Sequence, residues 1–139
     1  MADNAKTPRP VYRNIHVTDI VHYRLPLAGI VSILHRISGA LMFLLMPFII
    51  WMFDKSVSSE ISYDEFTAVF TGQAGWFFKL VVLGLIWAYL HHFCAGLRHL
   101  LMEVTHSYSK QAGKSTAVTT LVLSTGLTVV LAAKLFGLF

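Results

Sequence analysis

The stretch Ser32-Ile33-Leu34-His35-Arg36-Ile37-Ser38-Gly39 decides how the rest of the chain is interpreted. It places an imidazole and a guanidinium inside an otherwise apolar run, residues 30–53. A bilayer core about 30 Å thick needs a helix of about 20 apolar residues, so this run is long enough to span a membrane. Positions three, four and seven apart share one face of a helix, and here they are Ser32, His35, Arg36 and Gly39. Because a charge at membrane depth is costly, this face is a candidate functional site.

The composition is that of a small integral membrane protein. The chain has 139 residues, of which 55% are hydrophobic and only 13% are charged. Two further apolar runs, residues 76–103 and 115–138, complete three predicted spans. The single cysteine, Cys94, excludes an intramolecular disulfide framework. The sequence therefore predicts an all-α integral membrane protein whose three transmembrane helices form a small bundle.

The segments that flank the spans set the expected domains and orientation. Residues 1–29 form a basic N-terminal arm, either solvated at the lipid headgroups or docking a peripheral subunit, and residues 30–139 form the transmembrane domain. Lysine and arginine are more frequent in the arm and in residues 104–114 than in the polar loop, residues 54–75, where a short interfacial helix is expected around residues 63–70. By the positive-inside rule, the N-terminus is cytoplasmic and the C-terminus is outside. The basic residues are scattered at helix ends, which argues against nucleic-acid binding.

A second polar constellation lies late in the second span and contains His91, His92, Arg98 and His99. The first helix runs outward and the second returns, so the two constellations should lie in the same half of the membrane. Neutral imidazole is a common axial haem ligand, and arginine and histidine can hold haem propionates. Gly96 lies one turn after His92, where a missing side chain leaves room for a flat macrocycle. A bis-histidine haem needs a second imidazole, which points to another chain.

The same residues also have structural interpretations. A histidine on an apolar helix is often a hydrogen-bonded structural residue, Arg98 and His99 can snorkel to the headgroups, and the serines can bond backbone carbonyls. The third span offers only hydroxyls and is expected to pack. The residue patterns thus leave three functions open: a haem-binding bundle, a proton or ion pathway, and a purely structural anchor for a soluble enzyme.

Two motifs resemble the cytochrome b556 membrane-anchor subunits of succinate dehydrogenase, respiratory complex II. Residues 32–39 match the family pattern Ser-x-x-His-Arg-x-Ser/Thr-Gly, and residues 92–99 match His-x-x-x-Gly-x-Arg-His. Arg9-Pro10 and Tyr23-Arg24-Leu25-Pro26 are similar to the segments that precede the first helix. The chain departs from the pattern at Glu103, where the family has aspartate, and in a longer gap before Ser32.

The resemblance implies specific roles for these residues. His92 would be the axial ligand of the iron of haem b, with Gly96 giving clearance, and the Gly96 spacing favours His92 over His91. His35 and Arg36 would lie near the haem propionates. Ser32 and Arg36 would line the ubiquinone site.

The resemblance also implies the partners and the reaction. The chain would share haem b with a second membrane-anchor subunit and pass electrons from an iron–sulfur subunit to ubiquinone. The dicarboxylate chemistry would lie on a flavoprotein subunit, because this chain has neither the cysteine spacing for a cluster nor a Gly-rich turn for flavin. A quinol:fumarate reductase, which runs the reaction in reverse, shares these motifs. The lack of a clear transit peptide favours a bacterial inner membrane.

Overall fold

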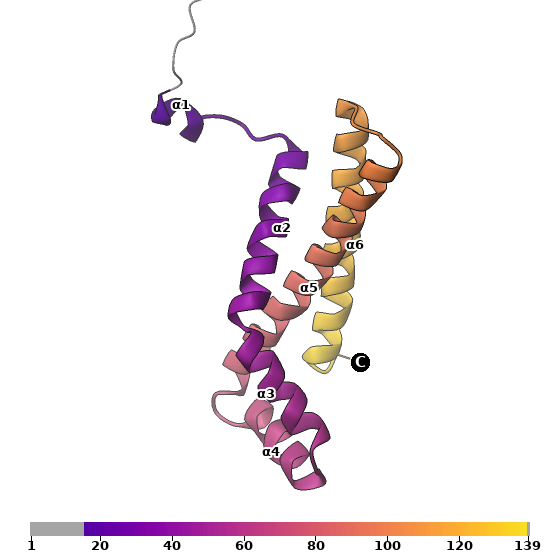
Figure 1. Ribbon diagram of the computed structural model, residues 1–139. Helices are drawn as coiled ribbons and strands as arrows, with labels where there is room; N and C mark the ends of the chain where they lie inside the picture. The colour runs from indigo at the N-terminus through magenta and orange to yellow at the C-terminus, as the bar shows by residue number, and fades with distance from the viewer. Residues whose placement is uncertain (1–15, 139) are drawn as a thin grey trace, which may run out of the picture.

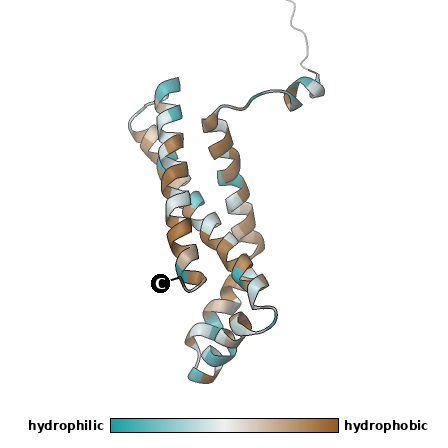
Figure 2. Ribbon diagram, turned by 180° about the vertical axis from the view of Figure 1, so that it is seen from behind, coloured by the Kyte–Doolittle hydropathy of each residue, from teal (hydrophilic) through white to brown (hydrophobic). Residues whose placement is uncertain are grey.

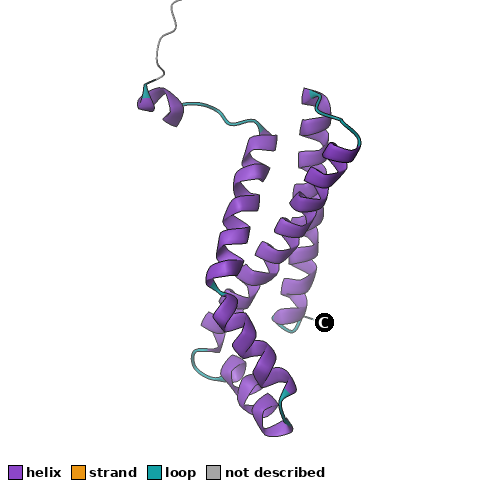
Figure 3. Ribbon diagram, in the orientation of Figure 1, coloured by secondary structure: helices purple, strands orange, loops and turns teal. Residues whose placement is uncertain are grey.

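The computed structural model describes residues 16–138 as helices joined by short turns, with no strand in that range (Figures 1 and 3). The helices are α1 (Val17–Val21), α2 (Leu27–Leu44), α3 (Met46–Val57), α4 (Glu60–Thr71), α5 (Gly75–Val104) and α6 (Lys110–Leu135). Three of them, α2, α5 and α6, are long and apolar enough to cross a membrane. The predicted all-α fold with three transmembrane helices is therefore confirmed. Arg9-Pro10 and most of the basic arm lie outside the described residues, and the side on which each terminus lies stays a prediction.

The first span differs from the single helix predicted over residues 30–53. α2 begins directly after Pro26 and ends at Leu44, and α3 begins at Met46. The break follows from Pro47, which has no N–H to donate and whose ring would clash with the carbonyl of Phe43 in a continuous helix. The prediction of one continuous helix is therefore wrong: the run is divided between α2, which is long and apolar enough to cross a membrane, and α3.

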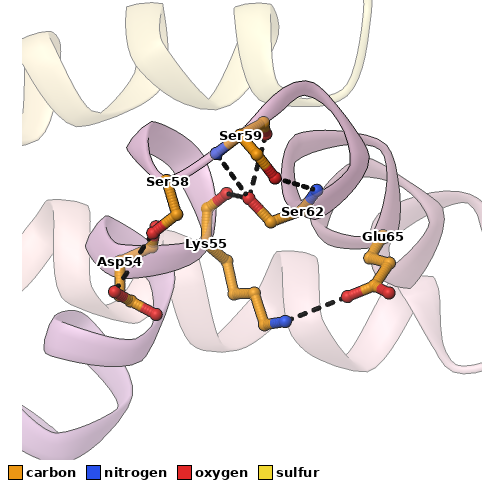
Figure 4. A network of polar contacts seen from close by, with 6 residues as sticks. All are labelled: Asp54, Lys55, Ser58, Ser59, Ser62 and Glu65. Atoms are coloured by element: carbon orange, nitrogen blue, oxygen red, sulfur yellow. Dashed lines mark hydrogen bonds and ion pairs between the residues drawn. The ribbon is translucent and has the colours of Figure 1, made fainter.

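α3 and α4 form a helical hairpin in which two residues make the turn (Figure 4). Ser59 caps α4, because its Oγ accepts a hydrogen bond from the Ser62 N–H at 3.1 Å. The Ser62 hydroxyl donates to the Lys55 carbonyl at 3.0 Å, and Lys55 Nζ pairs with Glu65 Oε2 at 2.9 Å. These bonds hold the two helices together, so the region predicted as a polar loop with a short helix, residues 54–75, is mostly helical.

The two long helices also have specific starting points. α5 begins at Gly75, where a Cβ atom would overlap the Phe70 carbonyl, so the turn from α4 requires glycine. With 30 residues, α5 is about 45 Å long, enough to cross a bilayer with tilt. α6 begins at Lys110, earlier than the predicted residue 115, because the Ser109 hydroxyl caps it by accepting from the Ala112 N–H at 3.1 Å.

The bundle is made by α2, α5 and α6, which pack against one another. Their contact uses small side chains: Val31, Ala95 and Ala117 form a buried cluster, and Ala88 and Ser124 are also buried. Most large apolar side chains are exposed on the outside of the bundle. Figure 2 shows hydrophobic residues along much of the length of the long helices. This arrangement suits lipid, where close backbone approach between small residues, rather than burial of large ones, drives helix association.

The topology brings distant residues together. The start of α2, the end of α5 and the start of α6 lie at one end of the bundle, and the α3–α4 hairpin lies at the other (Figure 1). Early residues of α2 therefore face late residues of α5.

Candidate functional site

His92 on α5 contacts the backbone of α2 directly. Its Nδ1 donates to the His35 carbonyl at 3.0 Å and lies 3.3 Å from the Ser38 hydroxyl. The imidazole rings of His35 and His92 stack, with centroids 4.1 Å apart and an interplanar angle of 30°. The two constellations that the sequence places in the same half of the membrane therefore meet.

This hydrogen bond fixes the tautomer of His92. A backbone carbonyl only accepts, so the proton of a neutral imidazole must be on Nδ1. Nε2 then keeps its lone pair, and it forms no hydrogen bond within residues 16–138. A ring held through Nδ1–H on a carbonyl is the usual arrangement of a metal-ligating histidine.

Gly39 provides the seat for the His92 ring. A Cβ atom at Gly39 would lie 2.9 Å from Cε1 and 3.2 Å from Nδ1 of His92, closer than side-chain atoms normally approach. The ring cannot easily move away, because the His35 carbonyl and the His35 ring hold it. The sequence identified Gly39 only as a gap on the polar face of the first helix, because its occupant comes from another helix.

Gly39→Ala should therefore loosen the contact between α2 and α5. We expect a loss of about 1–3 kcal/mol in stability, typical of overpacking at a constrained site. Thermal unfolding of the purified protein in mild detergent measures it. Gly84→Ala is the matched control, because a Cβ there meets no atom within 4 Å and alanine favours a helix by up to about 1 kcal/mol. Equal stability of the two variants would contradict this role of Gly39.

Gly96 faces a different group. A Cβ atom there would meet only Nε2 of His35, at 3.7 Å, an ordinary contact. The ring of His99, which is exposed, lies 5.4 Å from the ring of His35. His35 therefore lies between His92 and His99, and the predicted role of Gly96 as haem clearance stays a prediction.

Ser32 and Arg36 lie one turn apart on α2 and are open to an outside ligand. Ser32 is half-buried and Arg36 is exposed. Neither side chain hydrogen-bonds to another group in the described part of the chain, and no carboxylate there pairs with Arg36. The Ser32 hydroxyl and the Arg36 guanidinium therefore have no hydrogen-bond acceptor within this part of the chain.

His91 has a different environment from its neighbour. It is 1% exposed, its Nδ1 lies 3.2 Å from the Ser124 hydroxyl of α6, and its ring stacks on Trp87 with centroids 5.5 Å apart. Its Nε2 has no hydrogen-bond partner among residues 16–138. His91 thus fits the structural interpretation of a membrane histidine, and Ser124 is a partner that the sequence did not reveal.

Ser124→Ala should destabilise the contact between α5 and α6. It leaves both nitrogens of the buried His91 ring without a partner in the described chain, and hydrogen bonds between membrane helices contribute about 1 kcal/mol. Thr125→Val is the control, because it removes a hydroxyl from the next residue, which is exposed, and keeps the shape of the side chain. We expect a lower unfolding temperature for the first variant only, and a similar decrease in both would argue against the His91–Ser124 bond.

Arg98 is buried in the bundle and bonded to α6, and the alternative that it reaches the headgroups stays a prediction. It is 7% exposed, its Nε donates to the Thr116 hydroxyl at 3.0 Å, and its Nη2 donates to the Gly113 carbonyl at 3.4 Å. Both partners are on α6. The hydroxyls of α6 therefore bond to its own backbone, as at Thr120, and also to polar groups of α5.

Comparison with known proteins assigns the family. Residues 7–131 match the family described as succinate dehydrogenase/fumarate reductase transmembrane subunit. Three relatives are each named succinate dehydrogenase cytochrome b556 subunit. The relative from Coxiella burnetii is 34% identical, covering 76% of this chain and 83% of its own. The relative from Paracoccus denitrificans is 33% identical over 83% of each chain, and that from Rickettsia felis is 28% identical over 78% of this chain and 82% of its own. The chain therefore belongs to the transmembrane-subunit family of succinate dehydrogenase and fumarate reductase, and it is a multi-pass membrane protein.

Proposed function

We propose that this chain is the membrane-anchor subunit of a succinate:quinone oxidoreductase of a bacterial inner membrane, with its N-terminus in the cytoplasm. In this role it binds haem b together with a second anchor subunit and forms part of the ubiquinone-reduction site. The observation that carries the proposal is the arrangement of His92. Its Nδ1 is bonded to the backbone of α2, and the lone pair of its Nε2 can therefore bind a metal ion.

The residues around His92 fit a haem. His92 would hold the haem iron from this chain, and an imidazole of the second anchor subunit would supply the other protein ligand. When bound, haem b would supply a one-electron redox centre. His35, stacked on His92, and the exposed Arg36 are hydrogen-bond donors of the kind that hold propionate carboxylates. The enclosure of His91 by α6 and Trp87 is a further reason to prefer His92.

Ser32 and Arg36 are suited to bind ubiquinone. The Ser32 hydroxyl donates a hydrogen bond to a quinone carbonyl. Arg36 offers a fixed positive charge to the negative charge that develops on the quinone oxygen as electrons arrive. Such preorganised electrostatic stabilisation is strong where water is scarce. The electrons come from the iron–sulfur subunit, the dicarboxylate reaction belongs to the flavoprotein subunit, and the protons come from the aqueous side.

The direct test is to purify the complex through a tag on this chain, identify its proteins and record a dithionite-reduced minus oxidised absorbance spectrum. We expect a b-type α band together with a flavoprotein, an iron–sulfur protein and a second small membrane protein. An intact, folded chain that carried neither haem nor these partners would overturn the proposal. Proton flux through the chain in liposomes would then test the ion-pathway alternative. In a complex that does carry haem, activity with succinate and with fumarate tests the direction of catalysis.

A further inference from the structure

A cationic cavity lies at the end of the bundle where α2 begins. Its volume is about 740 Å³, and its walls come from the start of α2, the end of α5 and the start of α6. Four positively charged residues line it: Arg24, Arg98, Lys110 and Lys114. Tyr23 and Tyr108, which each carry a hydroxyl group, also line it. The cavity is thus large enough and polar enough for a charged headgroup.

No carboxylate neutralises these four charges within residues 16–138. The one ion pair in that range joins Lys55 to Glu65, on the α3–α4 hairpin at the opposite end of the bundle. Glu103, next to the lining residue Met102, is exposed and is not part of an ion pair with a described residue. Like charges gathered around one cavity repel each other, so an anion bound there would be stabilised.

Arg98 gives the strongest indication of a ligand. Burial of a charged group is expensive unless it is paired and hydrogen-bonded, and a guanidinium carries five N–H donors. Nε and Nη2 are bonded to α6, but Nη1 has no acceptor in the described part of the chain. Because Arg98 lines the cavity, its remaining donors are available to a bound anion.

The surroundings of Arg98 indicate that the anion is attached to a hydrocarbon chain. Arg98 also lines a second cavity, about 180 Å³, on the surface between α5 and α6. Three leucines line that cavity: Leu97, Leu101 and Leu123, and all three are about half exposed. One residue therefore borders both a cationic cavity and an apolar groove. A lipid that carries a phosphate and an acyl chain would place the phosphate in the cationic cavity and the acyl chain in the apolar groove.

We infer that this end of the bundle binds an anionic glycerophospholipid. Its phosphate lies among Arg98, Lys110 and Lys114, and an acyl chain follows the leucine-lined groove between α5 and α6. The site is separate from the His35–His92 contact and does not depend on haem or quinone binding. A free phosphate ion would use the cations but would leave the apolar groove unused.

The experiment uses the purified complex that contains this chain, stripped of lipid in mild detergent. It is titrated with phosphatidylglycerol, phosphatidylcholine or inorganic phosphate, and bound lipid is counted by native mass spectrometry. The test variant is Lys110→Gln/Lys114→Gln, in which both changes are on exposed positions. The control, Lys79→Gln/Lys134→Gln, removes the same charge at the opposite end of the bundle and leaves the Lys55–Glu65 ion pair in place.

We expect the test variant to bind phosphatidylglycerol roughly 30-fold more weakly, since each cation near a membrane surface contributes about a five-fold effect. The control variant should bind it as the unmodified complex does, and phosphatidylcholine should bind weakly to all three. Unchanged affinity in the test variant would overturn the inference. Displacement of the lipid by millimolar inorganic phosphate would also overturn it, because that result indicates a site for a free anion. Loss of a soluble subunit from the test variant would overturn it too, because that result indicates an acidic protein partner. The haem spectrum and quinone reduction of the same samples report separately on the proposed function.

Discussion

Replacing His92 with leucine should abolish the b-type absorbance band of the complex while the complex still assembles. Leucine has a similar volume but no lone pair, so the iron would lose its ligand from this chain. The bond to the His35 carbonyl, 3.0 Å long, and the stacking on the His35 ring would also be lost. The measurement is the reduced minus oxidised spectrum, normalised to the amount of co-purified flavoprotein.

His91→Phe is the matched control for this experiment. Phenylalanine keeps an aromatic ring against Trp87 and loses only the bond to Ser124. We expect it to keep the band at an unchanged wavelength and to lower the unfolding temperature. A spectrum that is unaltered in the His92 variant and lost in the His91 variant would assign the ligand to His91. A spectrum unaltered in both would assign it to a partner chain.

Replacing Arg36 with leucine should slow quinone reduction by about 100-fold, the usual effect of removing one preorganised donor from a dry site. Arg36 is exposed on α2, has no described internal partner and lies one turn from Ser32. Oxidation of succinate with an artificial acceptor should persist, because that reaction does not use this chain. Ser32→Ala should have a smaller effect, about 5-fold, since a neutral hydrogen bond contributes about 1 kcal/mol.

Lys134→Leu serves as the control for the loss of charge. Lys134 is an exposed cation in the last turn of α6, far along the chain from the α2 motif. The Lys134 variant should leave both quinone reduction and succinate oxidation with the artificial acceptor unchanged. If quinone reduction and artificial-acceptor activity fell together in a well-assembled Arg36 variant, the quinone role of Arg36 would be rejected. An Arg36 variant with normal turnover would favour the purely structural anchor.

The sequence determined the class of protein and the residues of interest. Hydropathy and length predicted three membrane helices, and the polar residues inside them identified the two motifs that meet in the structure. This succeeded because polar residues are rare at membrane depth, so each one stands out against an apolar background. Local rules available in the sequence, proline without an N–H and serine at a helix start, also explain the break at Leu45 and the early start of α6.

Only the tertiary structure decided which helix covers each residue. It placed Gly39 against His92, Ser124 against His91, and Thr116 against Arg98. In a soluble protein the apolar face of a helix shows which side is buried, but lipid is as apolar as a protein core, so a membrane span carries little such signal. The choice between two adjacent histidines therefore depends on which neighbouring helix contacts each ring, and that is a property of the packed bundle.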